Sequence, residues 1–167
     1  MKRRLESDGL RSVETFAYDS SGFACLEAEG RRLAGFLQTI DDGVNLVGYS
    51  MGGLLIRSAI REGAALPVKK VAFLNTPHSG SILARFFPGV GVAQMRPGCA
   101  FLKQIDDVPW GYDTFAVWTP GDLMVVPARS ACWSRAGKTG VCRVPAHVWP
   151  LISSSLHREL AKFLLAE

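Results

Sequence analysis

A serine lies between two glycines at positions 48, 50 and 52, in the sequence Gly-Tyr-Ser-Met-Gly. The apolar run Val44–Val47 precedes this motif, and a stretch that favours a helix follows it up to Gly63. A serine at this spacing, on a tight turn from a strand into a helix, is typical of an exposed nucleophile. The pattern also arises by chance in glycine-rich chains, so the flanking sequence must support the interpretation. Here the preceding run suits a strand and the following stretch suits a helix, as such a turn requires. We therefore predict that Ser50 is a nucleophile.

A serine hydroxyl attacks efficiently only when a base takes its proton and a carboxylate orients that base. With a nucleophile on such a turn, the acid and then the histidine follow later in the chain. Asp122 comes after the predicted strand Thr114–Trp118, and His147 comes after the predicted strand Val141–Val144. Because parallel strands end at the same edge of a sheet, the three side chains can converge there. The sequence therefore predicts Ser50, Asp122 and His147 as a catalytic triad.

The chain has three histidines, so the base can be chosen by comparing them. His157 lies within the last predicted helix beside charged residues, and we expect it to face solvent. His78 also follows a strand, but it precedes every acidic candidate, so we expect it to line the site. Three further acidic residues lie before the Thr114–Trp118 strand rather than at its end: Asp106, Asp107 and Asp113.

Predicted strands and helices alternate along the chain, which indicates an α/β fold with a mainly parallel sheet. The predicted strands are Val13–Tyr18, Val44–Val47, Val68–Leu74, Thr114–Trp118 and Val141–Val144, with a further apolar run at Leu123–Val126. Apolar residues at helical spacing predict one helix from Leu26 to Ile40 and a closing helix after Ser153–Ser155. Prolines break the segment 81–113, which we expect to form a small cap.

Length and composition limit the classes of protein to consider. The 167 residues suffice for one domain, and 48% hydrophobic with 20% charged residues indicates a core-rich fold. The net charge of +4 is scattered and no basic stripe is interleaved with aromatic residues, so no nucleic-acid partner is expected. No apolar run is long enough for a membrane span and no secretory leader is evident. We therefore expect no membrane insertion, and a cytoplasmic location if Met1 is the native start.

The four cysteines do not have the spacing of metal ligands, so no metal site is predicted. Cys132 and Cys142 flank one loop and could form a disulfide. Two reduced thiols are an equally good interpretation, because no export signal is evident.

Taken together, these motifs resemble those of the α/β-hydrolase superfamily, in particular its bacterial lipases and esterases. The resemblance lies in Val44–Gly53, Asn75–Ser81, Gln94–Leu102, Gly121–Pro127 and His147–Leu160. It implies a reduced α/β-hydrolase fold in a single domain spanning 1–167, with five to six mainly parallel strands and helices on both faces of the sheet. It also implies hydrolysis of a carboxylic ester or lipid through an acyl-serine, with no metal or organic cofactor.

The chain departs from this family in two ways. Position 49 is Tyr where these lipases often carry His. The strand and His-Gly motif that supply one backbone N–H of the oxyanion hole are missing, which leaves the Met51 N–H. We hypothesise that Val13–Tyr18 pairs directly with Val44–Val47, so that the turn after it brings Ser20 and Ser21 to the vacant oxyanion position. An uncovered strand edge also predicts self-association into a homodimer or larger assembly.

The residues near the predicted nucleophile suggest what would bind there. Candidates for lining the acyl or alcohol pocket are Tyr49, Thr76, Pro77, His78 and Trp149, and packing roles are alternatives for each. Short to medium acyl chains are favoured because little sequence is left for an extended lid. The competing interpretation is a truncated or non-catalytic relative that binds a partner without turning over a substrate.

Overall fold

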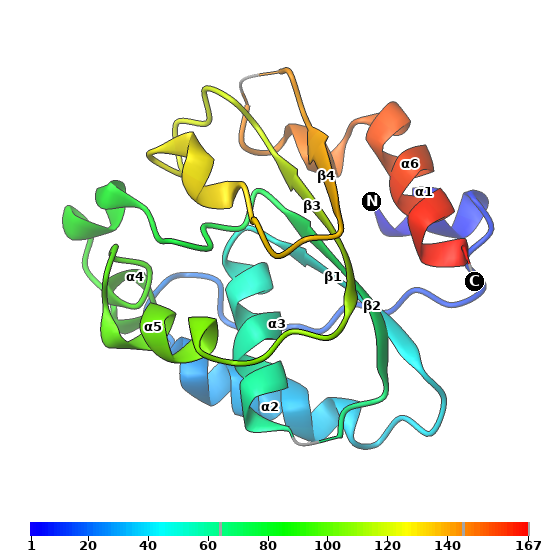
Figure 1. The fold of residues 1–167 in the computed structure, drawn as a ribbon, viewed down its shortest axis with the longest axis horizontal. Helices are drawn as coiled ribbons and strands as arrows, with labels where there is room; N and C mark the ends of the chain where they lie inside the picture. Colours follow the sequence, from blue (N-terminus) through cyan, green and yellow to red (C-terminus); the bar gives the residue numbers. More distant parts are fainter. Residues whose placement is uncertain (64, 145, 167) are drawn as a thin grey trace.

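Four parallel strands, paired in chain order, form the centre of the described part of the chain (Figure 1). The computed structural model describes residues 1–63, 65–144 and 146–166. The strands are β1 (Val44–Tyr49), β2 (Val68–Leu74), β3 (Asp113–Trp118) and β4 (Lys138–Val141). All three neighbouring pairs are parallel, so the carboxyl ends of the strands share one edge. The α/β class and the parallel sheet that the sequence predicted are therefore confirmed.

Helices cover both faces of the sheet, which explains why β2 is apolar at consecutive positions. Side chains alternate along a strand, so Val71 and Phe73 face one helical layer while Ala72 and Leu74 face the other. All four side chains are fully buried.

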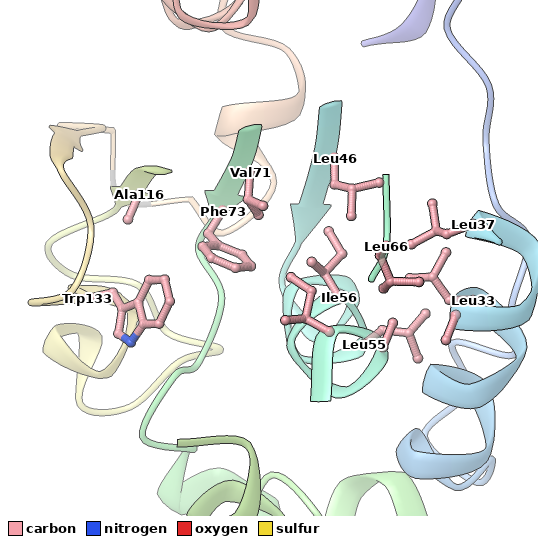
Figure 2. Packing of buried hydrophobic residues seen from close by; sticks show 13 residues of the cluster. Leu33, Leu37, Leu46, Leu55, Ile56, Leu66, Val71, Phe73, Ala116 and Trp133 are labelled. Atoms are coloured by element: carbon pink, nitrogen blue, oxygen red, sulfur yellow. The ribbon is translucent and has the colours of Figure 1, made fainter. Parts of the chain in front are cut away.

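The layer against Val71 and Phe73 contains α2 (Leu26–Leu37) and α3 (Met51–Glu62). Figure 2 shows Leu33 and Leu37 of α2 meeting Leu55 and Ile56 of α3 beside Leu46 of β1. The buried residues of α2 lie on one face, whereas α3 is buried at every position from Gly53 to Ile60. One side of α3 packs with α2 and the sheet, and Met51 and Leu54 pack with α5. The helix predicted after the serine motif is confirmed by α3, which ends just before Gly63.

The opposite layer contains α1 (Lys2–Ser7) and α6 (Ser154–Leu165), which lie together on the other side of the sheet in Figure 1. Leu5 of α1 and Leu160 of α6 belong to the core cluster on that side. The Ser153 hydroxyl accepts a hydrogen bond from the Leu156 N–H and so caps α6, as the serine run predicted.

The segment 81–113 contains the short helices η1 (Ile82–Arg85) and α4 (Val90–Ala93) and the two-turn helix α5 (Ala100–Asp106). Phe101, Leu102 and Ile105 of α5 are buried with Met51 and Leu54 of α3. This part of the predicted cap is therefore packed into the core. Two further short helices, η2 (Ala128–Ala131) and η3 (Trp149–Leu151), follow β3 and β4. None of the helices described is long and apolar enough to cross a bilayer.

The prediction of five to six strands is wrong for the residues described, which form four. Val13–Tyr18 is not a strand, and residues 123–126 form bends. The last strand is Lys138–Val141 rather than Val141–Val144, because Lys138, Thr139 and Gly140 pair with β3 despite their modest apolar character. Apolar content alone does not predict such an edge strand.

Val13–Tyr18 and β1 both line a groove of about 830 Å³ and do not pair with each other. Its apolar walls include Leu33, Phe36, Leu37, Leu46, Leu55 and Ile56. The N–H groups of Val44 and Ser50 point toward β2, where they donate hydrogen bonds to the carbonyl oxygens of Pro67 and Leu74. Because the backbone N–H and C=O groups of successive residues in a strand point to opposite sides, those of Val47 and Tyr49 point toward the groove. Among the described residues, β1 is therefore an edge strand of the sheet.

The expectation that His157 faces solvent is wrong. Its side chain is fully buried at the base of α6, and its Nε2 lies 3.1 Å from the Pro150 carbonyl oxygen. The prediction relied on the charged neighbours Arg158 and Glu159. Neighbouring positions on a helix point in different directions, so charged neighbours do not show that His157 is exposed. All four cysteines are free thiols, so Cys132 and Cys142 are not joined in this structure.

Two glycines of α2 give matched tests of this packing. A Cβ on Gly30 would lie 2.6 Å from the Cβ and 3.2 Å from the backbone carbonyl carbon of Ser58, whereas a Cβ on Gly35 meets nothing within 4 Å. We expect Gly30→Ala to lower the free energy of unfolding by about 1–3 kcal/mol through overpacking. Gly35→Ala should raise it by about 0.5–1 kcal/mol through helix propensity. Urea unfolding of both variants measures the difference, and equal effects would contradict this packing of α2 on α3.

Candidate active site

Ser50 occupies the turn between β1 and α3 with a backbone that non-glycine residues rarely adopt, at φ 50° and ψ −124°. The turn is held from both sides, because the Ser50 N–H donates to Leu74 O at 2.8 Å and the Gly53 N–H donates to Ser50 O at 3.1 Å. A Cβ on Gly48 would lie 2.6 Å from the Gly53 Cα, so the strand and helix meet too closely for a larger residue at position 48. The glycine spacing in the sequence is thus explained by local sterics.

The structure brings the three predicted side chains together at the carboxyl edge of the sheet. His147 Nε2 lies 2.9 Å from Ser50 Oγ, and His147 Nδ1 lies 2.6 Å from Asp122 Oδ2. Both distances are within hydrogen-bond range. With the Nδ1–H donated to the carboxylate, Nε2 is free to accept the serine proton. This arrangement can raise the nucleophilicity of a hydroxyl without a metal.

Asp122 is fixed by the backbone that follows it. Its Oδ1 accepts hydrogen bonds from the Met124 N–H at 2.8 Å and the Val125 N–H at 3.0 Å, which leaves Oδ2 for His147. The Asp122 side chain is 1% exposed and that of His147 is 12% exposed. The carboxylate is therefore shielded from water, while the imidazole keeps partial access to solvent.

A neighbouring serine holds the acid loop in place. The Ser81 hydroxyl donates to Met124 O and accepts from the Val126 N–H, both at 3.0 Å. Ser81 belongs to the segment after β2, so the loops after β2 and β3 are tied together. Ser81 was assigned no role from the sequence, although it lies in the Asn75–Ser81 motif.

Asn75 is a second residue of the site that was not singled out from the sequence. It follows β2 directly, is fully buried, and has a left-handed backbone with φ 49°. Its Nδ2 donates to His147 O at 2.9 Å, and its Oδ1 accepts from the Thr119 hydroxyl at 3.0 Å. The available signal in the sequence was an asparagine directly after a predicted strand, because asparagine tolerates a left-handed backbone better than most residues.

The Met51 N–H lies at the start of α3 beside Ser50 and has no partner among the described residues, as is usual for the first N–H groups of a helix. The strand Val13–Tyr18, on which the oxyanion hypothesis for Ser20 and Ser21 depended, does not form. The Ser21 N–H is already used, because it donates to Asp19 Oδ1 at 2.9 Å. The turn is also anchored elsewhere, since Gly22 O accepts from the Val92 N–H in α4. Ser21 is therefore a poor oxyanion donor.

Tyr49 lies beside the imidazole, with 5.1 Å between the Tyr49 and His147 ring centroids. Burial, and then the nearby Asp122 carboxylate, raise the pKa of Tyr49 to about 12. The phenol therefore stays neutral at ordinary pH and can act at the site only as a neutral hydroxyl.

The other predicted lining residues lie in different environments. Thr76 and Pro77 are buried, and Thr76 packs against Gly53. Trp149 is partly exposed in a hollow of about 230 Å³ between the chain after β4 and α6. In this conformation the side chains of Thr76 and His78 pack within the protein, so neither is displayed on an open surface.

His78 belongs to a buried cluster with Arg57 and Trp133. The imidazole stacks on the Trp133 ring at 4.7 Å, and its Nδ1 lies 3.5 Å from Arg57 Nη1. Arg57 is 1% exposed and is paired at 2.7 Å with Asp106, which compensates the burial of its charge. Burial, and then Arg57, hold the pKa of His78 well below its usual value. His78 is therefore a neutral packing residue here.

No group of three or more potential metal ligands is found among the described residues. A comparison of the sequence with protein-family models and with curated proteins found no match. The interpretation of this site therefore rests on its geometry and on the motifs of the sequence.

The depressed pKa of His78 predicts a loss of stability in acid. The native protein holds His78 neutral, whereas the unfolded chain protonates it below its ordinary pKa of about 6.5. The free energy of unfolding should therefore fall as the pH drops below 6.5, by up to about 1.4 kcal/mol per pH unit for this group. His78→Phe should flatten this slope even though it weakens the fold, and urea unfolding between pH 5 and 7.5 measures it. Gly30→Ala, which weakens the fold without removing a titrating group, should keep the wild-type slope, and an unchanged slope in His78→Phe would contradict the assignment.

Proposed function

We propose that this protein is a serine carboxylic-ester hydrolase that acts through an acyl-serine intermediate. The observation that carries the proposal is the continuous set of contacts from Asp122 through His147 to Ser50, at 2.6 and 2.9 Å. The strained backbone of Ser50 adds support. A serine with positive φ costs free energy, and such strain is concentrated at functional sites. The resemblance to α/β-hydrolases in the sequence points to the same chemistry.

In this mechanism Ser50 Oγ attacks the ester carbonyl carbon while His147 Nε2 takes the hydroxyl proton. The tetrahedral intermediate collapses, the bond to the leaving alkoxy oxygen breaks, and His147 returns the proton to that oxygen. A water molecule then attacks the acyl-serine with His147 again as base, which releases the carboxylic acid and regenerates the hydroxyl. Asp122 keeps Nδ1 protonated throughout and offsets the charge on the imidazolium.

The developing oxyanion needs hydrogen-bond donors. The Met51 N–H is one, at the positive end of the α3 dipole. We assign the second to the Tyr18 hydroxyl, which lies 3.3 Å from the position that a Cβ on Gly52 would occupy. A helical Cβ tilts toward the helix N-terminus, so the phenol lies beside the first turn of α3. Burial, and then Glu29, raise the pKa of Tyr18, so its hydroxyl keeps the proton that it would donate.

Apolar side chains next to the acid and the base favour an ester with an apolar acyl or alcohol group. Leu123 and Met124 follow Asp122, and Val148 and Trp149 follow His147. Leu123 is 76% exposed and Met124 62%, although both are apolar. Exposed apolar clusters are typical of surfaces that bind an apolar ligand or partner. Short to medium acyl esters remain our proposed substrates.

The competing function is a non-catalytic relative that uses the same scaffold for binding. The contacts that join Asp122, His147 and Ser50 favour the enzyme over this alternative. Self-association also remains a proposal, supported by the position of β1 as an edge strand among the described residues.

Ester turnover separates the two functions. We expect the wild-type protein to hydrolyse p-nitrophenyl butyrate, and Ser50→Ala and Asp122→Asn each to lower kcat by about 10⁴-fold or more. Ser134, which is exposed and remote from Ser50 in sequence, provides the control Ser134→Ala with unchanged rates. The spectrophotometric release of nitrophenolate measures all four proteins. A wild-type rate equal to that of Ser50→Ala would leave the binding function as the better account.

The proposed role of the Tyr18 hydroxyl is tested by Tyr18→Phe, which deletes one oxygen. Loss of one oxyanion donor should lower kcat by about 10²-fold or more with little change in KM. Tyr112→Phe is the matched control, because Tyr112 packs on Trp110, with 5.3 Å between the ring centroids, and should keep its kcat. Steady-state kinetics with p-nitrophenyl butyrate gives both constants, and a wild-type kcat in Tyr18→Phe would exclude this role.

A further inference from the structure

We infer that Asn75 is a positioning residue that joins the loop of the catalytic base to the loop of the catalytic acid. The inference rests on the proposed function, because it assigns Asn75 a role in holding His147 against Asp122. Asn75 lies at the end of β2, which is the strand between β1, with Ser50, and β3, with Asp122. This position places it beside the ends of β1 and β3, and its side chain extends from there to the backbone of His147.

Both the Nδ2 and the Oδ1 of Asn75 are hydrogen-bonded, and the orientation of the amide follows from these two partners. A carbonyl oxygen can only accept, so the group 2.9 Å from His147 O must be the NH₂ of Asn75. The carbonyl Oδ1 then faces the Thr119 hydroxyl at 3.0 Å, which donates to it. Asn75 and Thr119 are both fully buried, so water does not compete for these hydrogen bonds.

Thr119 carries the connection on to the acid. Its carbonyl oxygen accepts the Asp122 N–H at 3.1 Å, so the turn that presents the carboxylate begins at Thr119. The chain of contacts thus runs from the His147 backbone through Asn75 and Thr119 to the Asp122 backbone. The 2.6 Å contact between His147 Nδ1 and Asp122 Oδ2 closes this chain into a ring. His147 and Asp122 are therefore connected in two ways, directly through their side chains and indirectly through Asn75 and Thr119.

His147 needs such a tether because its loop is not held by the sheet. The pairing of β4 ends at Val141, before His147. Among the described residues on either side of His147, the backbone bonds from Ala146 to Val144 and from Trp149 to Ala146 are local turns. The hydrogen bond from Asn75 connects the His147 backbone to the rigid end of β2. A displacement of about 1 Å in a catalytic group can lower a rate by about 100-fold.

The left-handed backbone at position 75 allows a clean deletion. Glycine adopts φ near +50° readily, so Asn75→Gly removes the amide without straining the turn. Asn75→Asp keeps the shape but loses the NH₂ donor. At position 119, Thr119→Val removes the hydroxyl with nearly the same shape, and Thr119→Ser keeps it.

We expect Asn75→Gly and Asn75→Asp to lower kcat for p-nitrophenyl butyrate by about 10- to 100-fold, with KM changed less than about twofold. Thr119→Val should act in the same direction, and Thr119→Ser should restore most of the activity. Asn45→Asp is the matched control, because Asn45 Nδ2 also donates to a backbone carbonyl, that of Leu164, at 3.0 Å, but in α6. It should lower the melting temperature and leave kcat unchanged.

A second measurement does not depend on turnover. The proton on His147 Nδ1, held against a carboxylate at 2.6 Å, should give a far-downfield proton resonance that His147→Ala abolishes. We expect that resonance to broaden or vanish in Asn75→Gly and to persist in Asn45→Asp. Folded Asn75→Gly protein with the wild-type resonance and kcat would overturn the inference. If the wild-type protein shows no esterase activity, the proposed function fails, and the resonance still decides whether Asn75 positions His147.

Discussion

The parallel pairing of the sheet is the constraint on which the site depends. Each strand ends at the same edge, so the chain after β1, β2, β3 and β4 enters one region in turn. Ser50, Asn75, Asp122 and His147 come from those four exits. Helices on both faces bury the strands, and that burial fixes the exits relative to one another. The hydrogen bonds among the loops refine an arrangement that the backbone already imposes.

The features that local sterics and periodicity determine were mostly predictable from the sequence. The turn at Ser50 was predictable because its glycines allow the strand and the helix to approach closely. The helix α3 was predictable because residues that favour a helix run from the serine motif to Gly63. The relay was predictable because chain order and parallel strands together limit which loops can meet. Val13–Tyr18 was mispredicted because its composition suits a strand, whereas in the structure it lines a groove beside β1 without pairing to it. Pairing is a tertiary property, and composition does not encode the neighbour.

Buried polar side chains were the harder part to predict. His78, Arg57 and His157 are all polar residues that the fold buries, and their roles depend on partners far away in sequence. Arg57 is compensated by Asp106 and stacks near Trp133, with 5.0 Å from its guanidinium carbon to the ring centroid. Asn75 depends in the same way on two loops. A residue's type indicates that it needs hydrogen bonds, but only the fold determines where they are made.

The order of the strands in the sheet also bears on when Ser50, the nucleophile that we propose, would meet its base. Neighbours in the sheet are neighbours in the chain, so the sheet can grow by adding one crossover unit at a time. The Ser50 hydroxyl is positioned by β1 and β2, whereas His147 reaches it only after β4 has joined the sheet. An incompletely assembled chain therefore carries an ordinary, unreactive serine. Under the proposed function, the reactivity of Ser50 is therefore a property that only the fully folded molecule acquires.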